Sequence, residues 1–62
     1  MSKEALLNLL RSKQGSYISG NELGTALGIS RAAVWKMIQA LRAQGYRIES
    51  RTNKGYFLVE QP

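Results

Sequence analysis

Hydrophobic residues recur at helical spacing in three separate stretches of this chain. The first stretch, residues 3–13, predicts a helix, because its apolar positions lie three and four residues apart and form one stripe. Ser2 suits the N-cap of this helix, and basic residues near its end suit the negative pole of the helix dipole. We expect the core-facing stripe to consist of Leu6, Leu9 and Leu10, with Leu7 on its flank.

A second helix is expected to begin directly after Ser19. Ser19 and Glu22 have the spacing of a capping box, and Ile18 and Leu23 flank this cap as a hydrophobic staple. Gly28 then supplies a residue that adopts positive φ and ends the helix. The buried face of this helix is predicted to comprise Leu23, Ala26 and Leu27.

The third helix repeats this pattern of start and stop signals. Ser30 is its predicted cap, Ile29 and Val34 form a second staple, and Gly45 ends it. Residues 28–30 therefore form a three-residue turn between two helices, which is the spacing of a DNA-binding helix-turn-helix. Steps of about 100° per residue place Val34, Met37, Ile38 and Leu41 on the buried face. The same steps place Ala32, Trp35, Lys36 and Gln39 on the opposite face.

The hydrophobic period then changes from helical to alternating, which predicts a β-hairpin. Residues 46–50 and 56–60 are rich in β-formers, and the polar segment 51–55 between them predicts a loop of about five residues. Residues 17–18 form a short extended segment that could add a strand to this sheet. The order helix, short strand, helix, helix, hairpin predicts a mainly α domain with a small β-sheet, which is a winged helix-turn-helix.

The alternation also assigns the two faces of the hairpin. Ile48 and Leu58 should face the helices, and Tyr46 and Tyr56 share their parity and could cover the edge of the core. The residues of opposite parity are either covered by the extended segment and the first helix, which we favour, or left as an apolar patch. These residues are Phe57 and Val59. We expect the domain to occupy residues 1–60, and residues 61–62 to begin a linker to a domain absent from this chain.

Composition narrows the function. Nine Lys and Arg residues against four acidic residues, all of them Glu, give a net charge of +5, which favours a polyanionic partner. The chain has neither Cys nor His, so disulfides, thiolate metal sites and histidine acid–base chemistry are excluded. No phosphate-binding loop or nucleophile elbow is present, so we expect no catalysis, metal or cofactor in this chain. No apolar run approaches ~20 residues and the start lacks a signal-peptide pattern, so we expect a cytoplasmic protein without a membrane partner.

The placement of the basic residues points to double-stranded DNA. Arg31 and Lys36 lie on or beside the exposed face of the third helix, and the hairpin loop carries Arg51 and Lys54. A basic helix in the major groove and a basic loop over the backbone would form a two-point grip on a duplex. The predicted DNA-contacting residues are Ser30, Arg31, Ala32, Trp35, Lys36, Gln39, Arg51, Thr52, Asn53 and Lys54.

Several of these residues have a specific expected role. Ala32 either touches a thymine methyl group or is simply a good helix former. Gln39 could pair with an adenine edge and Arg31 with a guanine, whereas Lys36 fits a phosphate better. Trp35 falls outside the buried arc; we expect most of its area to pack on the second helix or the hairpin while its edge borders the DNA surface.

Four segments of the chain carry a resemblance to a known family. They are Ile-Ser-Gly-Asn-Glu-Leu at 18–23, Leu-Gly-Ile-Ser-Arg-Ala-Ala-Val-Trp-Lys at 27–36, Ile-Gln-Ala-Leu-Arg-Ala-Gln-Gly-Tyr at 38–46 and Lys-Gly-Tyr at 54–56. Together they make nearly the whole chain resemble the N-terminal domain of the biotin operon repressor/biotin–protein ligase family. The joint occurrence of Ser-Arg-x-Ala-Val-Trp-Lys and Lys-Gly-Tyr makes this resemblance specific.

The resemblance implies a repressor domain that binds operator DNA. In that family a following catalytic domain makes biotinyl-adenylate and transfers biotin to a carrier protein, and the adenylate promotes dimerisation through that domain. The family's DNA-contacting helix corresponds to residues 30–42 and its wing to residues 51–55, whereas its glycine- and arginine-rich adenylate loop has no counterpart here. The resemblance thus implies that biotinyl-adenylate binds the absent domain, and that this domain alone is a monomer or weak dimer while its parent is a homodimer on DNA.

Two other functions remain open at this point. The domain could be a winged-helix protein-interaction module whose third helix docks on a partner protein. It could also be a stand-alone helix-turn-helix regulator that responds to a different effector. The exposed face of the third helix distinguishes them, because its cations and those of the loop favour phosphate.

Overall fold

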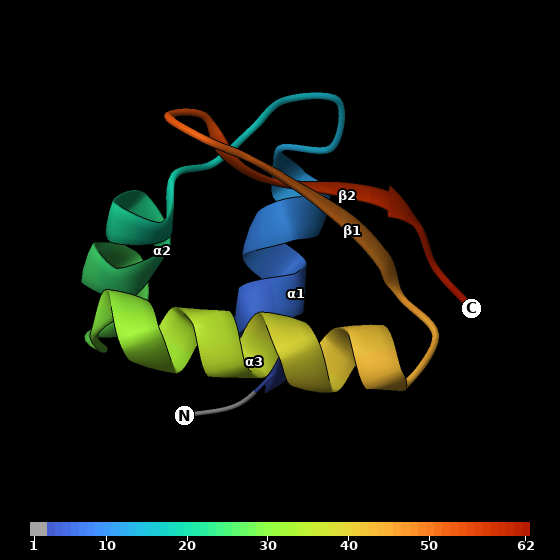
Figure 1. Cartoon of the computed structure of the whole chain (residues 1–62), viewed down its shortest axis with the longest axis horizontal. Helices are drawn as coiled ribbons and strands as arrows, with labels where there is room; N and C mark the ends of the chain where they lie inside the picture. Colours follow the sequence, from blue (N-terminus) through green and yellow to red (C-terminus); the bar gives the residue numbers. More distant parts are fainter. Residues whose placement is uncertain (1–2) are drawn as a thin grey trace.

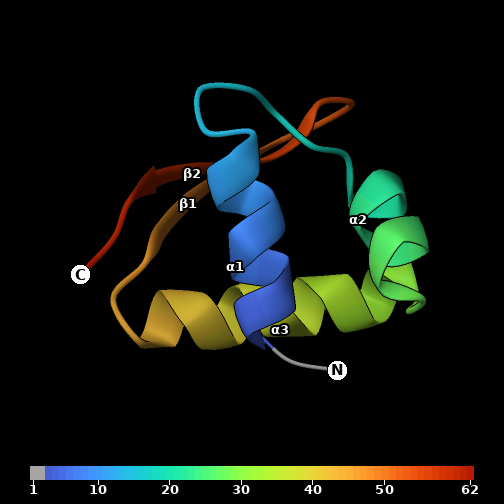
Figure 2. The ribbon, with the colours of Figure 1, turned by 180° about the vertical axis from the view of Figure 1, so that it is seen from behind.

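A computed structural model describes residues 3–62 of the chain, so the predicted cap at Ser2 lies outside the described residues. The elements are α1 (Lys3–Ser12), α2 (Gly20–Leu27), α3 (Arg31–Ala43), β1 (Arg47–Arg51) and β2 (Gly55–Glu60). α1 crosses α3 steeply, α2 stands at the start of α3, and the hairpin lies over the end of α1 that is remote from α3 (Figure 1). The view from behind shows the same arrangement, with the tip of the hairpin reaching over α2 (Figure 2). This is the predicted winged helix-turn-helix.

A single hydrophobic core joins all the elements. In α1 the core-facing side chains are Leu6, Leu7 and Leu10, whereas Leu9 is only partly buried, so the true stripe is rotated toward the predicted flank. The rotation follows from the position of α1, which contacts α2, α3 and β2 and is therefore covered on more than one side. The buried hydrophobic residues are Leu6, Leu7, Leu10, Ile18, Leu23, Val34, Ile38, Leu41, Ile48 and Leu58.

The start of α2 confirms most of the predicted signals. The Ser19 hydroxyl accepts a hydrogen bond from the Glu22 N–H at 2.9 Å, and both staple residues are buried. The Glu22 carboxylate lies 3.6 Å from the Lys13 ammonium, an exposed ion pair. At the end of the helix, Gly28 adopts the left-handed conformation as predicted.

The predicted burial of Ala26 is wrong. Ala26 is exposed, and Gly24 is buried in its place. A Cβ atom on Gly24 would lie 2.6 Å from the carbonyl oxygen of Ile29, so only glycine allows the turn to return this closely to α2. The buried face of α2 is thus set by the tight turn into α3, which is not visible in the helical spacing of α2.

α3 agrees with the prediction at its start, on its buried face and at its end, whereas Gln39 of the predicted exposed face is half-buried. The Ser30 hydroxyl accepts a hydrogen bond from the Ala33 N–H at 3.1 Å, and Val34, Ile38 and Leu41 are buried. Met37 is half-buried against the core. The guanidinium of Arg42 donates two hydrogen bonds to the carbonyl oxygen of Ile48, at 3.0 and 2.6 Å, and thereby ties the end of α3 to β1.

The hairpin has a shorter loop than predicted. Arg51 pairs with Gly55 in the antiparallel ladder, which leaves a three-residue turn, 52–54. The Lys54 N–H donates to the Arg51 carbonyl at 3.1 Å, Asn53 has φ +68°, and Gly55 has φ +112°. Because these two left-handed residues close the turn early, the outer residues of the expected loop become strand residues.

The expected additional strand is reduced to one bridge. The Ile18 N–H donates to the Tyr56 carbonyl at 2.9 Å, and the Tyr56 N–H donates to the Ile18 carbonyl at 2.8 Å. In the described part of the chain the sheet itself contains only β1 and β2. The bridge nevertheless has a structural consequence, because it fastens the turn end of the hairpin to Ile18, the residue that precedes the cap of α2.

On the outer face of the hairpin, one of the two apolar residues is covered and the other is exposed, so each predicted alternative applies to one residue. The ring of Phe57 lies 5.2 Å from that of Tyr17, whose hydroxyl donates to the Glu49 carboxylate at 3.0 Å, so the extended segment does cover Phe57. Val59 is 41% exposed and stays uncovered. On the inner face, Ile48 and Leu58 are buried and the two tyrosines pack on the core, as predicted.

The chain beyond β2 lies against α1. The side-chain oxygen of Gln61 accepts two hydrogen bonds from the Arg11 guanidinium, at 2.9 and 2.6 Å. Arg11 also donates to the side-chain oxygen of Asn8 at 3.3 Å. This cation is therefore engaged within the domain.

Gly55→Ala should destabilise the domain by roughly 2 kcal/mol or more. The positive φ is strained for alanine, and the added Cβ would collide with the carbonyl oxygen of Ile18, a backbone atom that cannot move without breaking the bridge to Tyr56. Gly15→Ala is the matched control, because Gly15 also has a positive φ but has nothing within 4 Å of an added Cβ. Urea unfolding of both variants measures the difference, and equal losses of stability would contradict this account.

Candidate nucleic-acid interface

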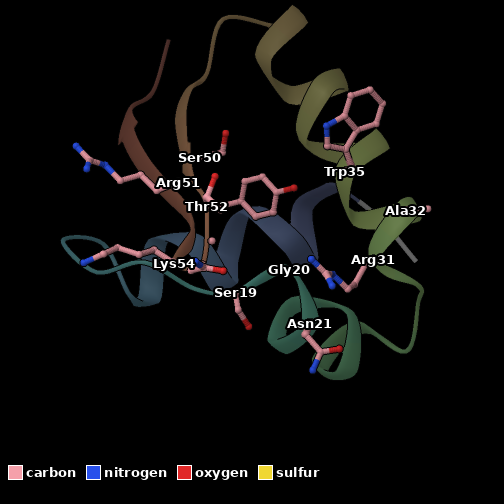
Figure 3. A pocket seen from close by; sticks show the side chains of 13 residues that line it. Ser19, Gly20, Asn21, Arg31, Ala32, Trp35, Ser50, Arg51, Thr52 and Lys54 are labelled. Carbon is pink, nitrogen blue, oxygen red and sulfur yellow. The ribbon is translucent and has the colours of Figure 1, made fainter.

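A groove of about 780 Å³ separates the hairpin from the helix-turn-helix. Its walls are the start of α2, the first turns of α3 and the turn of the hairpin with its flanking residues, and Figure 3 shows the side chains of these three walls around one hollow. We call this hollow the wing groove. Of the residues predicted to contact DNA, those that line it are Arg31, Ala32, Trp35, Arg51, Thr52, Asn53 and Lys54.

The remaining predicted residues lie outside the wing groove on the same helix. Ser30 is exposed at the cap of α3, with its hydroxyl bound to the Ala33 N–H. Lys36 is exposed beside Trp35, and Gln39 is half-buried one turn further along. The structure therefore brings seven of the ten predicted residues into one groove and leaves these three along the outer face of α3.

Trp35 is more exposed than predicted. Its side chain is 55% exposed, so it does not pack most of its area on α2 or the hairpin. It projects from α3 on the side opposite the buried residues, and the wing stands across the groove from it (Figure 3). More than half of Trp35 is consequently accessible to a ligand at the edge of the groove.

Sequence reasoning missed the wall that α2 contributes. Ser19, Gly20 and Asn21 line the wing groove at the start of α2, opposite the turn of the hairpin. Tyr56 also lines it, although it was predicted only to cover the core. The extended segment before α2 was the available signal, because its pairing with the hairpin brings the following residues alongside the wing.

The carboxylates of the domain are kept away from the wing groove, whose lining residues include no Asp or Glu. Glu22 pairs with Lys13, and Glu60 lies 3.7 Å from the guanidinium of Arg47. Glu49 accepts the hydrogen bond from Tyr17, and the fourth carboxylate, that of Glu4, lies in the first turn of α1. The groove is therefore bounded by positive and neutral groups only.

The cations are also divided by location. Four have partners within the domain: Arg11 with Gln61, Lys13 with Glu22, Arg42 with Ile48 and Arg47 with Glu60. In the described part of the chain, the cations in or beside the wing groove form no hydrogen bond or ion pair, and on α1 Lys3 is likewise unpaired. These unpaired groove-side cations are Arg31, Lys36, Arg51 and Lys54. Such a face is suited to bind phosphates, because its charges are exposed and uncompensated.

Two other kinds of feature are absent from residues 3–62. No cluster of three or more metal-ligating side chains occurs within this range. None of the helices described there has the length and apolar character needed to cross a membrane. The wing groove, of about 780 Å³, is larger than a second hollow of about 270 Å³ that is lined by Arg42 and Glu49 among other residues.

Comparison with known proteins agrees with this geometry. A family model of the HTH domain matches residues 2–57. The bifunctional ligase/repressor BirA of Bacillus subtilis (strain 168) is 42% identical over 60 residues, which are 97% of this chain and 18% of that protein. The proteins of the same name from Salmonella typhimurium and Escherichia coli (strain K12) are 46% and 48% identical over 89% and 74% of this chain.

The chain spans less than a fifth of the length of these relatives, 18% at most. The matches nevertheless cover both the helix-turn-helix and the wing, the two parts that build the groove. They confirm the resemblance to the DNA-binding domain of the biotin operon repressor. From its fold, its basic groove and the family match over residues 2–57, the chain belongs to the helix-turn-helix (HTH) domain family of DNA-binding regulators.

Proposed function

We propose that this domain binds double-stranded operator DNA in a sequence-specific manner, as the DNA-binding part of a transcriptional repressor. α3 enters the major groove, and the turn of the wing contacts the adjacent backbone. The observation that carries the proposal is the wing groove itself, which Arg31 of α3 and Arg51 and Lys54 of the wing line together with neutral residues and without any carboxylate.

The positions of these cations match the two parts of the proposed grip. Arg31 stands at the start of α3, where a recognition helix meets base edges and phosphates. Arg51 precedes the turn and Lys54 lies within it, across the groove from Arg31, and both side chains point away from α3 (Figure 3). Lys36, on the outer face of α3, binds a phosphate on the other side of the helix.

The repressor role rests on the relatives. Their printed name, bifunctional ligase/repressor, joins an enzymatic and a regulatory activity in proteins more than five times as long as this chain. Within the proposal, residues 3–62 supply the non-catalytic, DNA-binding part. The wing groove is an open surface rather than an enclosed pocket, and it does not suit a buried effector such as biotinyl-adenylate. Under the proposal that effector, the ligase and the dimer contacts of a homodimeric cytoplasmic parent lie outside these residues.

A protein-interaction role is the competing proposal, and one observation favours it. Trp35 and Ala32 are both exposed, and a tryptophan on a helix face is a common anchor for a partner protein. The two proposals differ in their dependence on salt, because phosphate contacts release counterions whereas an apolar anchor does not.

Binding to a duplex of mixed sequence should weaken steeply as salt is added. Contacts to about four or five phosphates give a slope near −4 when the logarithm of the association constant is plotted against that of the salt concentration. Fluorescence anisotropy of a labelled duplex over a series of salt concentrations measures this slope. A slope indistinguishable from zero would contradict DNA binding through the wing groove.

The double variant Arg51→Ala/Lys54→Ala should weaken binding to all duplexes and make the salt slope shallower by about 2. Both side chains are exposed and unpaired, so the fold should remain intact. The matched control is Lys13→Ala/Arg47→Ala, which removes the same net charge from residues that pair with Glu22 and Glu60 outside the groove. Urea unfolding checks the stability of both. Equal losses of affinity in the two double variants would remove the wing from the mechanism.

A further inference from the structure

We infer that Ala32 and Trp35 form an apolar strip on α3 that recognises thymine methyl groups in the major groove. The inference rests on the proposed function and deepens it, since it names the chemical group that the domain reads. On α3 the fold leaves one large hydrophobic residue, Trp35, exposed.

Trp35 is an exposed large hydrophobic residue that lines the wing groove. In the described part of the chain only Trp35 and Val59 are large hydrophobic residues classed as exposed, and Val59 lies on β2, outside this groove. Ala32 and Trp35 both line the groove and are three residues apart, so they are neighbours on one face of the helix. An exposed methyl group and an exposed indole thus form a continuous apolar strip.

The strip is set among cations. Arg31 precedes it on α3, Lys36 follows it, and the wing presents its two basic residues from across the groove. A ligand that fits this surface therefore carries negative charges at its edges and an apolar group between them. Duplex DNA has this combination, because phosphates border a major groove in which the apolar group is the C5-methyl group of thymine.

The position of the strip along α3 is also appropriate. The strip lies in the first turns of α3, and recognition helices contact base edges with their N-terminal residues. Small and aromatic apolar side chains are the types that contact thymine methyl groups. The indole N–H forms no hydrogen bond within residues 3–62, so it is free to donate to an acceptor on the same base pair.

Stacking of an unpaired base on the indole is a different use of the same side chain. It requires a single strand, or a base removed from the duplex. The groove favours the duplex, because the basic turn of the wing stands across from the strip and fits a second, parallel line of phosphates. Single-strand binding is therefore treated as an outcome of the test.

The test removes methyl groups one at a time from the DNA. A duplex is first selected by the 62-residue chain from a pool with a randomised core, and each thymine of the enriched duplex is then replaced by deoxyuridine. The replacement deletes only the C5-methyl group and keeps the base pair. At one or more positions the affinity of the unmodified protein should fall about four-fold per methyl, which corresponds to the transfer free energy of such a group.

The protein variants complete a double-mutant cycle. In Trp35→Ala the sensitive deoxyuridine positions should lose their effect, to less than two-fold, because the indole, which is the larger part of the apolar strip, is gone. Trp35→Phe should restore part of the sensitivity. Lys36→Ala is the neighbouring control; it should weaken binding to all duplexes and leave the four-fold effect of deoxyuridine intact.

The outcomes separate this inference from the proposed function. Failure to enrich any duplex, deoxyuridine effects below two-fold throughout, effects that persist in Trp35→Ala, or tighter binding to a single strand than to its duplex would each overturn the methyl-reading strip. If salt-dependent duplex binding survives in these cases, the proposed DNA grip stands without the strip, although failure to enrich any duplex would remove its sequence specificity. If no duplex is bound at all, the proposed function falls with it.

Discussion

The pair of backbone hydrogen bonds between Ile18 and Tyr56 is the interaction on which the functional surface depends. These bonds, 2.9 and 2.8 Å long, join residues far apart in the sequence. On one side of the bridge, Ser19 caps α2; on the other, Gly55 closes the turn of the wing. Two walls of the wing groove therefore begin within one residue of a single contact, and the collision that a side chain at Gly55 would cause shows how closely the backbones meet.

The third wall is held by packing and by one polar tie. Val34, Ile38 and Leu41 bury one face of α3, which leaves the opposite face to solvent. The hydrogen bonds from Arg42 to Ile48 connect the end of α3 to the strand that leads to the wing. The same domain that satisfies its other arginines internally leaves those of the groove without partners. The separation of paired from unpaired cations, more than the net charge, determines which face of the domain carries uncompensated positive charge.

Local signals in the sequence predicted the helices well, because their causes lie within a few residues of each other. The hydroxyls of Ser19 and Ser30 bind N–H groups three residues on, and glycine stops α2 where predicted. The failures concern backbone features that hydrophobic spacing does not show. Ala26 is exposed because the turn toward Ile29 makes Gly24 the contact residue, and the hairpin loop is shorter because left-handed residues close it early.

The candidate site was predictable for the two walls that α3 and the wing supply, including their uncharged residues. The basic residues of α3 and the wing were identified from their positions alone. The contribution of α2 was not, because it follows from a pairing between residues 38 positions apart, Ile18 and Tyr56. The extent of the exposure of Trp35 was not predicted either, because the angle of a residue on a helix does not show how much of its surface neighbouring elements cover.

The tie from Arg42 to Ile48 and the bridge from Ile18 to Tyr56 also have a mechanical consequence, because they clamp the hairpin at both of its ends. The hairpin cannot move away from the helices without breaking one of these hydrogen-bonded contacts. A duplex contacted by both α3 and the wing would have to match the spacing that these contacts hold, so the energy of bending or narrowing the DNA would fall on the nucleic acid. The affinity of the domain would then depend on how easily each DNA sequence deforms, even at base pairs that no side chain contacts.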